Sequence, residues 1–118
     1  MGRQQDYIEA SSELLRKAQE ALAQGDLMQA SERGWGAADQ VMKAVAESRG
    51  WPHNGHRLLF ETVGRLAQDT GDPGPRELFL AANALHTNFY EGWLTREDVA
   101  LARERVRQLR ERLRPLAV

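Results

Sequence analysis

The spacing of apolar residues constrains the fold of this chain more than any other feature. Apolar side chains recur every three or four positions, and nowhere do they alternate with period two over a useful length. The clearest series lies near the end of the chain, at Val99, Ala102, Val106, Leu109 and Leu113. Because a helix of 3.6 residues per turn brings such positions onto one face, the chain is predicted to be all-α. The expected architecture is an antiparallel, up-and-down bundle of four to five helices.

Turn-forming residues divide the chain into five predicted helices, over about residues 6–24, 27–49, 55–70, 76–90 and from 95 onward. Gly25-Asp26 combines a helix stop with an N-cap, and Gly50 suits a left-handed helix end. Asn54 is predicted to cap the third helix, and Thr95 with Asp98 has the spacing of a capping box. The longest breaker, residues 71–75, is too short for a domain linker, so residues 1–118 are predicted to form a single helical-bundle domain.

Composition limits the classes of chemistry that the protein can perform. The chain has 118 residues and no cysteine, which excludes disulfides and thiolate chemistry. The first residues are polar, and no apolar run approaches the roughly 20 residues needed to span a bilayer. We therefore expect a cytoplasmic protein without a membrane partner.

Charge is spread unevenly along the chain. The net charge is −1, yet the segment from Arg96 onward carries seven arginines and four acidic residues. Four of these arginines form a stripe on the last predicted helix, which a phosphate-bearing partner could use; they are Arg103, Arg107, Arg110 and Arg114. The alternative is a solvated helix face, because Glu104 and Glu111 lie three or four residues from several of them.

Two glycines flank a tryptophan in the middle of the second predicted helix, at Gly34-Trp35-Gly36. Each glycine costs a helix interior about 1 kcal/mol relative to alanine, so something must use the missing side chains. Close approach of a neighbouring helix is one explanation. Contact of a ligand or a partner chain with bare backbone is the other.

Polar residues gather at the end of the fourth predicted helix, where Asn83, His86, Asn88 and Tyr90 lie close to an apolar seam. These four residues are the leading candidates for a ligand-binding site. The alternative is a partly buried histidine whose ring nitrogens are satisfied by neighbouring polar groups. The seam itself consists of Leu78, Ala82, Leu85 and Phe89.

Arg49, His53 and His56 surround the turn between the second and third predicted helices. Arginine can clamp a phosphate and histidine can exchange a proton near neutral pH, so these residue types suffice for RNA cleavage. The alternative is that Arg49 neutralises a helix C-terminus and the histidines are exposed turn residues. No carboxylate stands at a recognised ligand spacing from the histidines, so no metal site and no cofactor are expected.

Two blocks of sequence give the chain a resemblance to the HEPN superfamily (higher eukaryotes and prokaryotes nucleotide-binding), and within it to the PaREP-type branch. The first block is residues 25–38 with Trp35, followed by Lys43 and the turn at 49–53; the second is residues 84–91, Ala-Leu-His-Thr-Asn-Phe-Tyr-Glu. The resemblance implies a bundle of four or five helices, usually a homodimer, that recognises a nucleotide or RNA. Many relatives are partners of a small nucleotidyltransferase in toxin–antitoxin pairs.

Active ribonucleases of that superfamily use an arginine, four to six further residues, and a histidine. If His86 were that histidine, one of residues 79–81 would be arginine, and none is. Arg49 and His56 have the required spacing, but at a different helix junction from the one the superfamily uses. We therefore carry over from the resemblance only His86, Asn88 and Tyr90.

The sequence favours a non-catalytic, dimeric helical module that recognises a nucleotide, RNA or a protein partner near His86 and Trp35. One alternative is a metal-independent ribonuclease in which His86, Arg49 and His56 are the catalytic candidates. Another is an interaction adaptor, because residues 14–41 resemble a single tetratricopeptide helical hairpin.

Overall fold

The computed structural model of the chain describes residues 2–117, and within them it contains helices and turns but no strand. The all-α prediction is therefore confirmed. None of these helices combines the length and the apolar character needed to cross a bilayer. The elements are α1 (Arg3–Ala23), α2 (Leu27–Arg49), α3 (His56–Thr70), α4 (Gly74–Glu91), α5 (Arg96–Leu113) and the short 3-10 helix η1 (Arg114–Leu116).

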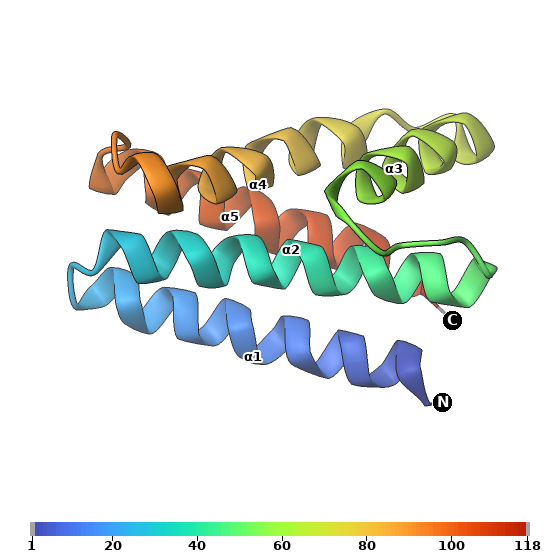
Figure 1. Cartoon of the computed structure of the whole chain (residues 1–118), viewed down its shortest axis with the longest axis horizontal. Coiled ribbons are helices and arrows are strands. Elements are labelled where there is room, and N and C mark those ends of the chain that lie inside the picture. Colours follow the sequence, from blue (N-terminus) through green and yellow to red (C-terminus); the bar gives the residue numbers. More distant parts are fainter. Residues whose placement is uncertain (1, 118) are drawn as a thin grey trace.

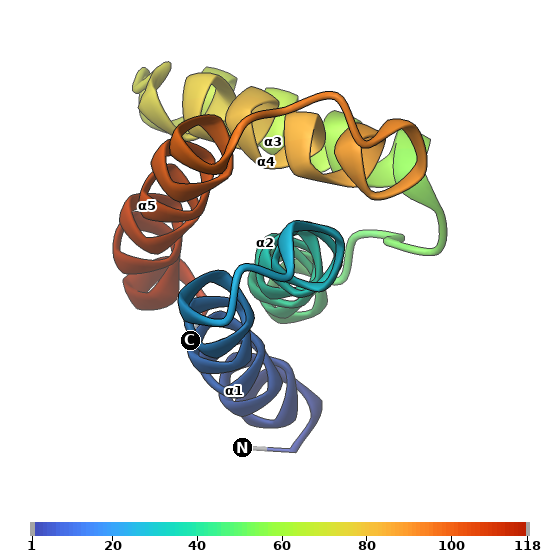
Figure 2. The same cartoon turned by 90° about the vertical axis from the view of Figure 1, so that its left-hand side faces the viewer.

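Helix α2 lies at the centre of the fold. It runs antiparallel beside α1 (Figure 1), and the view turned by 90° shows α1, α5 and the α3–α4 pair arranged around it (Figure 2). Helix α4 crosses α2 obliquely, and the shorter α3 packs against both. Helices α4 and α5 pack against the α1–α2 hairpin, so the side of the hairpin that they cover is not open to a peptide of the kind a tetratricopeptide-like adaptor would bind.

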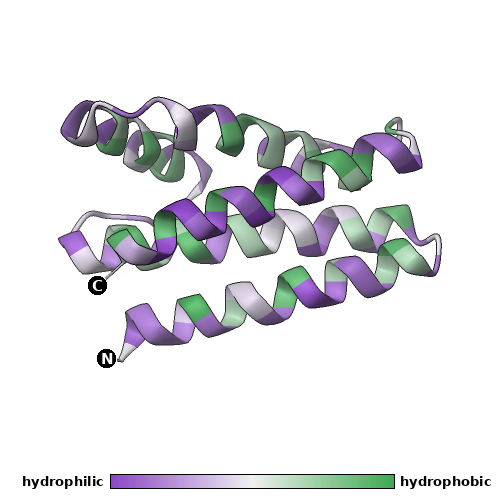
Figure 3. Cartoon of the chain, turned by 180° about the vertical axis from the view of Figure 1, so that it is seen from behind, coloured by the Kyte–Doolittle hydropathy of each residue, from purple (hydrophilic) through white to green (hydrophobic). Residues whose placement is uncertain are grey.

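Small side chains make the central position of α2 possible. Ala37, Ala38 and Ala44 are fully buried on it, beside Val41 and Met42. The remaining core comes from the predicted faces of the other helices, and each fully buried leucine or valine stabilises the fold by about 1.5–3 kcal/mol. Seen from behind, each helix carries both hydrophobic and hydrophilic residues (Figure 3), as expected of helices that bury one side and expose the other.

Most of the helix ends follow the sequence predictions. The Asp26 side chain accepts a hydrogen bond from the Gln29 backbone N–H at 3.1 Å, and Gly50 ends α2 with φ +70°. Thr95 and Asp98 form a complete capping box at the start of α5. The prediction that Asn54 caps α3 is wrong. The N-cap position falls one residue later, on Gly55, which has no side chain that could accept a hydrogen bond from the first turn.

The two glycines beside Trp35 allow neighbouring helices to come close to α2. A Cβ atom added at Gly34 would lie 2.8 Å from Leu85 Cδ1 on α4. A Cβ atom added at Gly36 would lie 3.2 Å from Leu14 Cδ1 on α1. The close-packing explanation for this motif is therefore confirmed, although Trp35 itself is only half-buried.

Candidate functional site

Three aromatic rings from three helices meet on the side of the bundle where α2, α3 and α4 come together. Trp35 of α2, His56 of α3 and His86 of α4 have ring centroids 4.8 Å apart in each of the three pairs. The two imidazoles are nearly parallel, with an interplanar angle of 25°. We call these residues the histidine–tryptophan cluster. All three members were candidates in the sequence, His86 and Trp35 for ligand binding and His56 for catalysis, and the fold brings them together.

Two phenylalanines fix the cluster to the core. Phe79 is fully buried and lies 5.6 Å from the Trp35 ring and 4.9 Å from Phe60. Phe60 in turn lies 5.3 Å from the His56 ring. These contacts hold the three outer rings at the surface of a rigid base, so a ligand would meet a surface that is already ordered.

Asn83 and Tyr90 complete the rim on α4. His56 Nε2 lies 2.8 Å from Asn83 Oδ1, so Nε2 donates to the amide oxygen and the opposite nitrogen of that ring is left for another partner. The Tyr90 ring meets His86 edge-on at 5.6 Å and is 70% exposed. The rim therefore presents an imidazole, an amide and a phenol to the outside.

His86 sits in an environment that disfavours its charged form. Partial burial lowers the pKa of His86 below its ordinary value, and the neighbouring His56 lowers it further, while Asp39 opposes both effects. The ring is accordingly neutral near pH 7, with one nitrogen donating and the other accepting. A neutral imidazole can hydrogen-bond the edge of a polar ring without attracting an anion.

A hollow of about 360 Å³ adjoins the cluster on its α1–α2 side and shares Trp35 with it. The His86 ring is half-buried, so it is not sealed inside the bundle. The acidic side chains of the hollow outnumber the basic ones, although Lys43 pairs with Asp39 at 3.2 Å. The lining consists of Leu14, Gln29, Glu32, Arg33, Trp35, Gly36 and Asp39.

Asn88 is buried in the fold and does not line this site. It is 1% exposed, and its Nδ2 donates to Ser31 Oγ at 2.9 Å. Its Oδ1 accepts from the Leu94 backbone N–H at 2.8 Å. The amide thus ties the turn after α4 to α2, and no part of it remains for a ligand. We remove Asn88 from the predicted binding set for this reason.

Arg49 and His53 also have partners away from the cluster. Arg49 Nη1 donates to the Leu116 carbonyl at 2.7 Å and so holds the C-terminal turn against α2. His53 lies 2.9 Å from a Glu47 carboxylate oxygen and edge-on to Tyr7. The structure therefore separates Arg49 and His53 from His56. Residues 2–117 contain no group of three histidines or carboxylates placed to hold a metal ion.

The predicted basic stripe on α5 divides into two parts. Arg107 pairs with Glu104 and Glu111 at 2.6 and 2.7 Å, and its hydrogen bonds lower the pKa of Glu104 to about 2. Arg110 and Arg114 instead border a hollow of about 370 Å³ between α1 and α5. Carboxylate neutralisation thus accounts for Arg107, whereas Arg103, Arg110 and Arg114 have no ion pair within residues 2–117.

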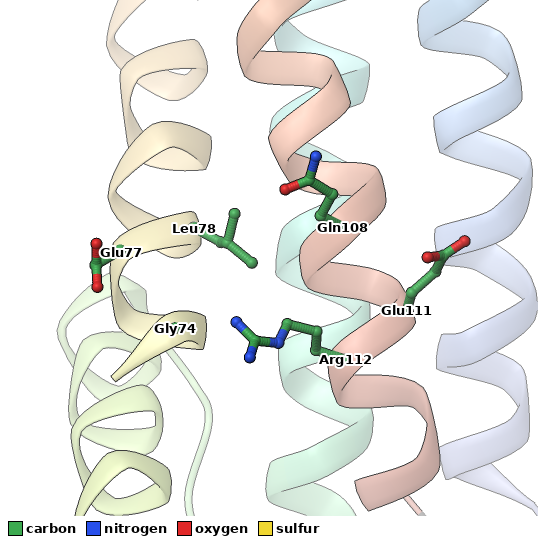
Figure 4. Close-up of a pocket in the computed structure, with 6 residues that line it drawn as sticks. All are labelled: Gly74, Glu77, Leu78, Gln108, Glu111 and Arg112. Atoms are coloured by element: carbon green, nitrogen blue, oxygen red, sulfur yellow. The ribbon is translucent and has the colours of Figure 1, made fainter. Parts of the chain in front are cut away.

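Another hollow, of about 450 Å³, lies between α4 and α5 near the start of α4 (Figure 4). Arg112 reaches across it toward α4 and pairs with Asp72 at 3.1 Å. Its guanidinium occupies the space that a Cβ atom at Gly74 would need. The hollow carries charged and amide groups and no aromatic ring, so it lacks the chemistry of the cluster.

Comparisons with known proteins identify the fold and the family. The family model described as the archaeal PaREP1/PaREP8 family matches residues 6–110, which include the whole cluster. A crystal structure of a protein from Sulfolobus solfataricus is similar, with a TM-score of 0.78 and 23% sequence identity over 92% of this chain and 97% of that chain. At this identity the likeness shows a shared fold alone. No curated protein matches the chain.

Proposed function

The chain belongs to the archaeal PaREP1/PaREP8 family, and we propose that it is a non-catalytic module that binds a planar ring on its histidine–tryptophan cluster. The expected ring is the base of a nucleotide or of RNA. One observation carries the proposal: three rings from separate helices lie 4.8 Å from one another, with His56 exposed at the surface. Aromatic and imidazole faces stack on bases of any sequence, and each stacked base contributes about 1–3 kcal/mol.

Polar groups around the cluster support recognition of a base edge. The Asn83 amide has donors besides the oxygen that meets His56, and neutral His86 supplies both a donor and an acceptor. Tyr90 adds an exposed hydroxyl at the same rim. A purine or pyrimidine edge, which carries both donors and acceptors, complements these groups.

The charge beside the cluster favours contact with the base over contact with the phosphate. Glu32 and Asp39 line the adjoining hollow against a single arginine. Because Lys43 pairs with Asp39, the hollow offers a phosphate little net charge of either sign, so a nucleoside and its monophosphate should bind within about threefold of each other, a difference below about 0.7 kcal/mol.

The resemblance to HEPN proteins extends the proposal to partners. We place the module in the cytoplasm, as a homodimer, in a toxin–antitoxin-like pair with a nucleotidyltransferase. Co-purification from the native organism tests the pair, with the His86→Ala chain as bait beside the wild type.

Calorimetry tests the ring site. The full chain is titrated with nucleosides, nucleoside monophosphates and short RNA. His86→Ala should weaken binding about tenfold or more, because one stacking partner is lost. His53→Ala is the matched control, since that imidazole packs on Tyr7 outside the cluster. Equal affinity of wild type and His86→Ala for every ligand would remove the site.

Ribonuclease activity is the second candidate, favoured by the two stacked imidazoles of His56 and His86. One could take the 2′-hydroxyl proton while the other protonates the leaving oxygen. Arg49 is engaged with the Leu116 carbonyl, so it does not supply the charge that would steady the phosphorane. Incubation of concentrated, EDTA-treated protein with labelled RNA tests this candidate. Cleavage that depends on His56 and His86 would support it, and intact RNA would end it.

A further inference from the structure

The hollow between α1 and the end of α5 is lined by two arginines that no carboxylate neutralises. It measures about 370 Å³, which is near the lower end of the range of about 300–1,000 Å³ found for small-ligand pockets. Helices α1 and α5 lie next to each other at this hollow (Figure 2). Arg110 of α5 and Arg114 of η1 form one wall. The other wall comes from the first half of α1 and consists of Gln5, Ile8, Glu9 and Ser12.

The two guanidinium groups are close together and lack partners. Arg110 and Arg114 are four residues apart, about one helical turn, so their like charges repel each other. Neither forms an ion pair within the described part of the chain. Glu111 follows Arg110 in the sequence, but its carboxylate pairs with Arg107 at 2.7 Å. The charge at this wall is therefore uncompensated.

Arg110 is the less solvated of the two arginines. Its Nε is buried and has no hydrogen-bond partner. Burial lowers the pKa of Arg110 below its ordinary value, the charge of Arg114 lowers it further, and Glu111 opposes both effects. A guanidinium stays protonated in a protein, so the cost of this environment falls on the charged group itself. An anion in the hollow would offset that cost.

The wall on α1 adds neutral donors and one acid. Ser12 is exposed and brings a hydroxyl to the hollow. Gln5 Nε2 donates to Glu9 Oε1 at 3.3 Å, so the two side chains are joined along α1. Glu9 forms no ion pair with either arginine, although its charge opposes an anion in the hollow. With two arginines and one glutamate, the lining as a whole is basic.

We propose that this hollow binds the phosphate group of a small, soluble phosphate ester, between Arg110 and Arg114 on one wall and Ser12 on the other. A guanidinium holds a phosphate through two parallel hydrogen bonds. A terminal phosphate has three acceptor oxygens in a tetrahedral arrangement, so it can face both walls at once. A carboxylate is planar and has two oxygens, which a single guanidinium already engages. Donors on two opposite walls therefore favour a phosphate over a carboxylate.

This phosphate site is separate from the ring site. The histidine–tryptophan cluster is built on α2, α3 and α4, whereas the hollow is built on α1, α5 and η1. Glycerol phosphate contains no ring and probes the hollow alone, and a nucleoside contains no phosphate and probes the cluster alone. A nucleoside monophosphate carries both groups and is left out of this test. The two proposals therefore succeed or fail separately.

A nuclear magnetic resonance titration of the isotope-labelled full chain with glycerol phosphate tests the hollow. We expect saturable shifts of the Ser12 and Arg110 backbone amides with a dissociation constant of about 1 mM or below, and no shift at His86. Arg110→Gln and Arg114→Gln should each weaken binding about tenfold or more, because a charge-assisted contact is lost. The absence of a saturable shift up to about 20 mM ligand would overturn the proposal.

Arg105→Gln is the matched control, because it removes the same charge from α5 at a residue that lines a different hollow. Its affinity for glycerol phosphate should stay within about twofold of the wild type. Equal losses in Arg105→Gln and Arg110→Gln would show that the ligand responds only to overall charge, which would overturn the site. The fold of each variant is checked by circular dichroism. If Arg110→Gln does not fold, Arg114→Gln decides, since Arg114 is exposed.

Two further arms test the chemistry of the ligand. Glu9→Gln removes the one acid of the lining and should tighten binding of glycerol phosphate severalfold. Acetate should bind at least tenfold more weakly than glycerol phosphate, and equal binding would overturn the assignment to phosphate. Saturable binding of inorganic phosphate without binding of glycerol phosphate would identify free phosphate as the ligand and overturn the assignment to an ester.

Discussion

On the side of α4 that faces α2, Asn88 is buried and uses both ends of its amide in hydrogen bonds within the chain. Two residues earlier, His86 lies half-buried against three other rings, and its pKa is lowered. The two side chains belong to the same short motif of the sequence. Their difference shows that a polar residue beside a helical core is either fully hydrogen-bonded within the chain or left accessible, according to the groups it meets on the neighbouring helices.

The largest expected effect tests the structural side of this comparison. Asn88→Ala leaves the partly buried Leu94 backbone N–H without an acceptor and opens a small cavity in the core, so the free energy of unfolding should fall by about 2–3 kcal/mol. Asn83→Ala, which removes a rim amide, should cost less than about 1 kcal/mol. Urea unfolding followed by circular dichroism measures both. Equal losses would mean that the two amides do not differ in role.

The close contact between α2 and α4 gives the next effect. Gly34→Ala forces a Cβ atom to within 2.8 Å of Leu85 Cδ1, and overpacking of this kind costs about 1–3 kcal/mol. Both substitutions gain about 1 kcal/mol in helix propensity, but this gain offsets only the milder contact of Gly36→Ala, whose Cβ atom would lie no closer than 3.2 Å to the Leu14 side chain. The same unfolding experiment should therefore show a loss for Gly34→Ala and almost no change for Gly36→Ala. A stabilised Gly34→Ala would show that α4 can move away from α2.

The positions of most helix ends could be predicted because their causes are local. Asp26 and the Thr95–Asp98 box cap helices by bonds to residues three positions away, and these bonds are visible in the sequence. The cap of α3 could not be predicted, because Asn54 and Gly55 compete for one position and the path of the chain before α3 decides between them.

The candidate site could be predicted only in part. His86, Asn83 and Tyr90 share one stripe of α4, so helical periodicity already groups them. The contact between His56 and His86 depends on how α3 packs on α4, and no pattern joins residues 30 positions apart. Phe79 and Phe60, which support the rings from below, were missed for the same reason. The resemblance that pointed to His86 also pointed to Asn88, since a sequence motif does not record burial.

A smaller effect concerns the rim of the site. Tyr90 is largely exposed and contacts His86 by its ring edge, so Tyr90→Ala should change the free energy of unfolding by no more than about 0.5 kcal/mol. The same change should weaken base binding measurably, because the rim loses an aromatic face and a hydroxyl. Calorimetry and urea unfolding of one protein batch give both values. A loss of stability without a change in binding would place Tyr90 with Asn88 as a structural residue.

The smallest expected effect is the dependence of stability on pH. Burial and the neighbouring His56 lower the pKa of His86 in the folded chain below the ordinary value of 6.5. The unfolded chain therefore takes up a proton at this residue more readily than the folded chain does. The resulting contribution to stability is fully present above pH 6.5 and is lost as the pH falls from there toward the folded-state pKa. Between pH 7.5 and pH 5, roughly the range in which histidine titrates, the urea midpoint of the wild type should thus fall more than that of His86→Gln. Parallel curves for wild type and His86→Gln would contradict the lowered pKa of His86.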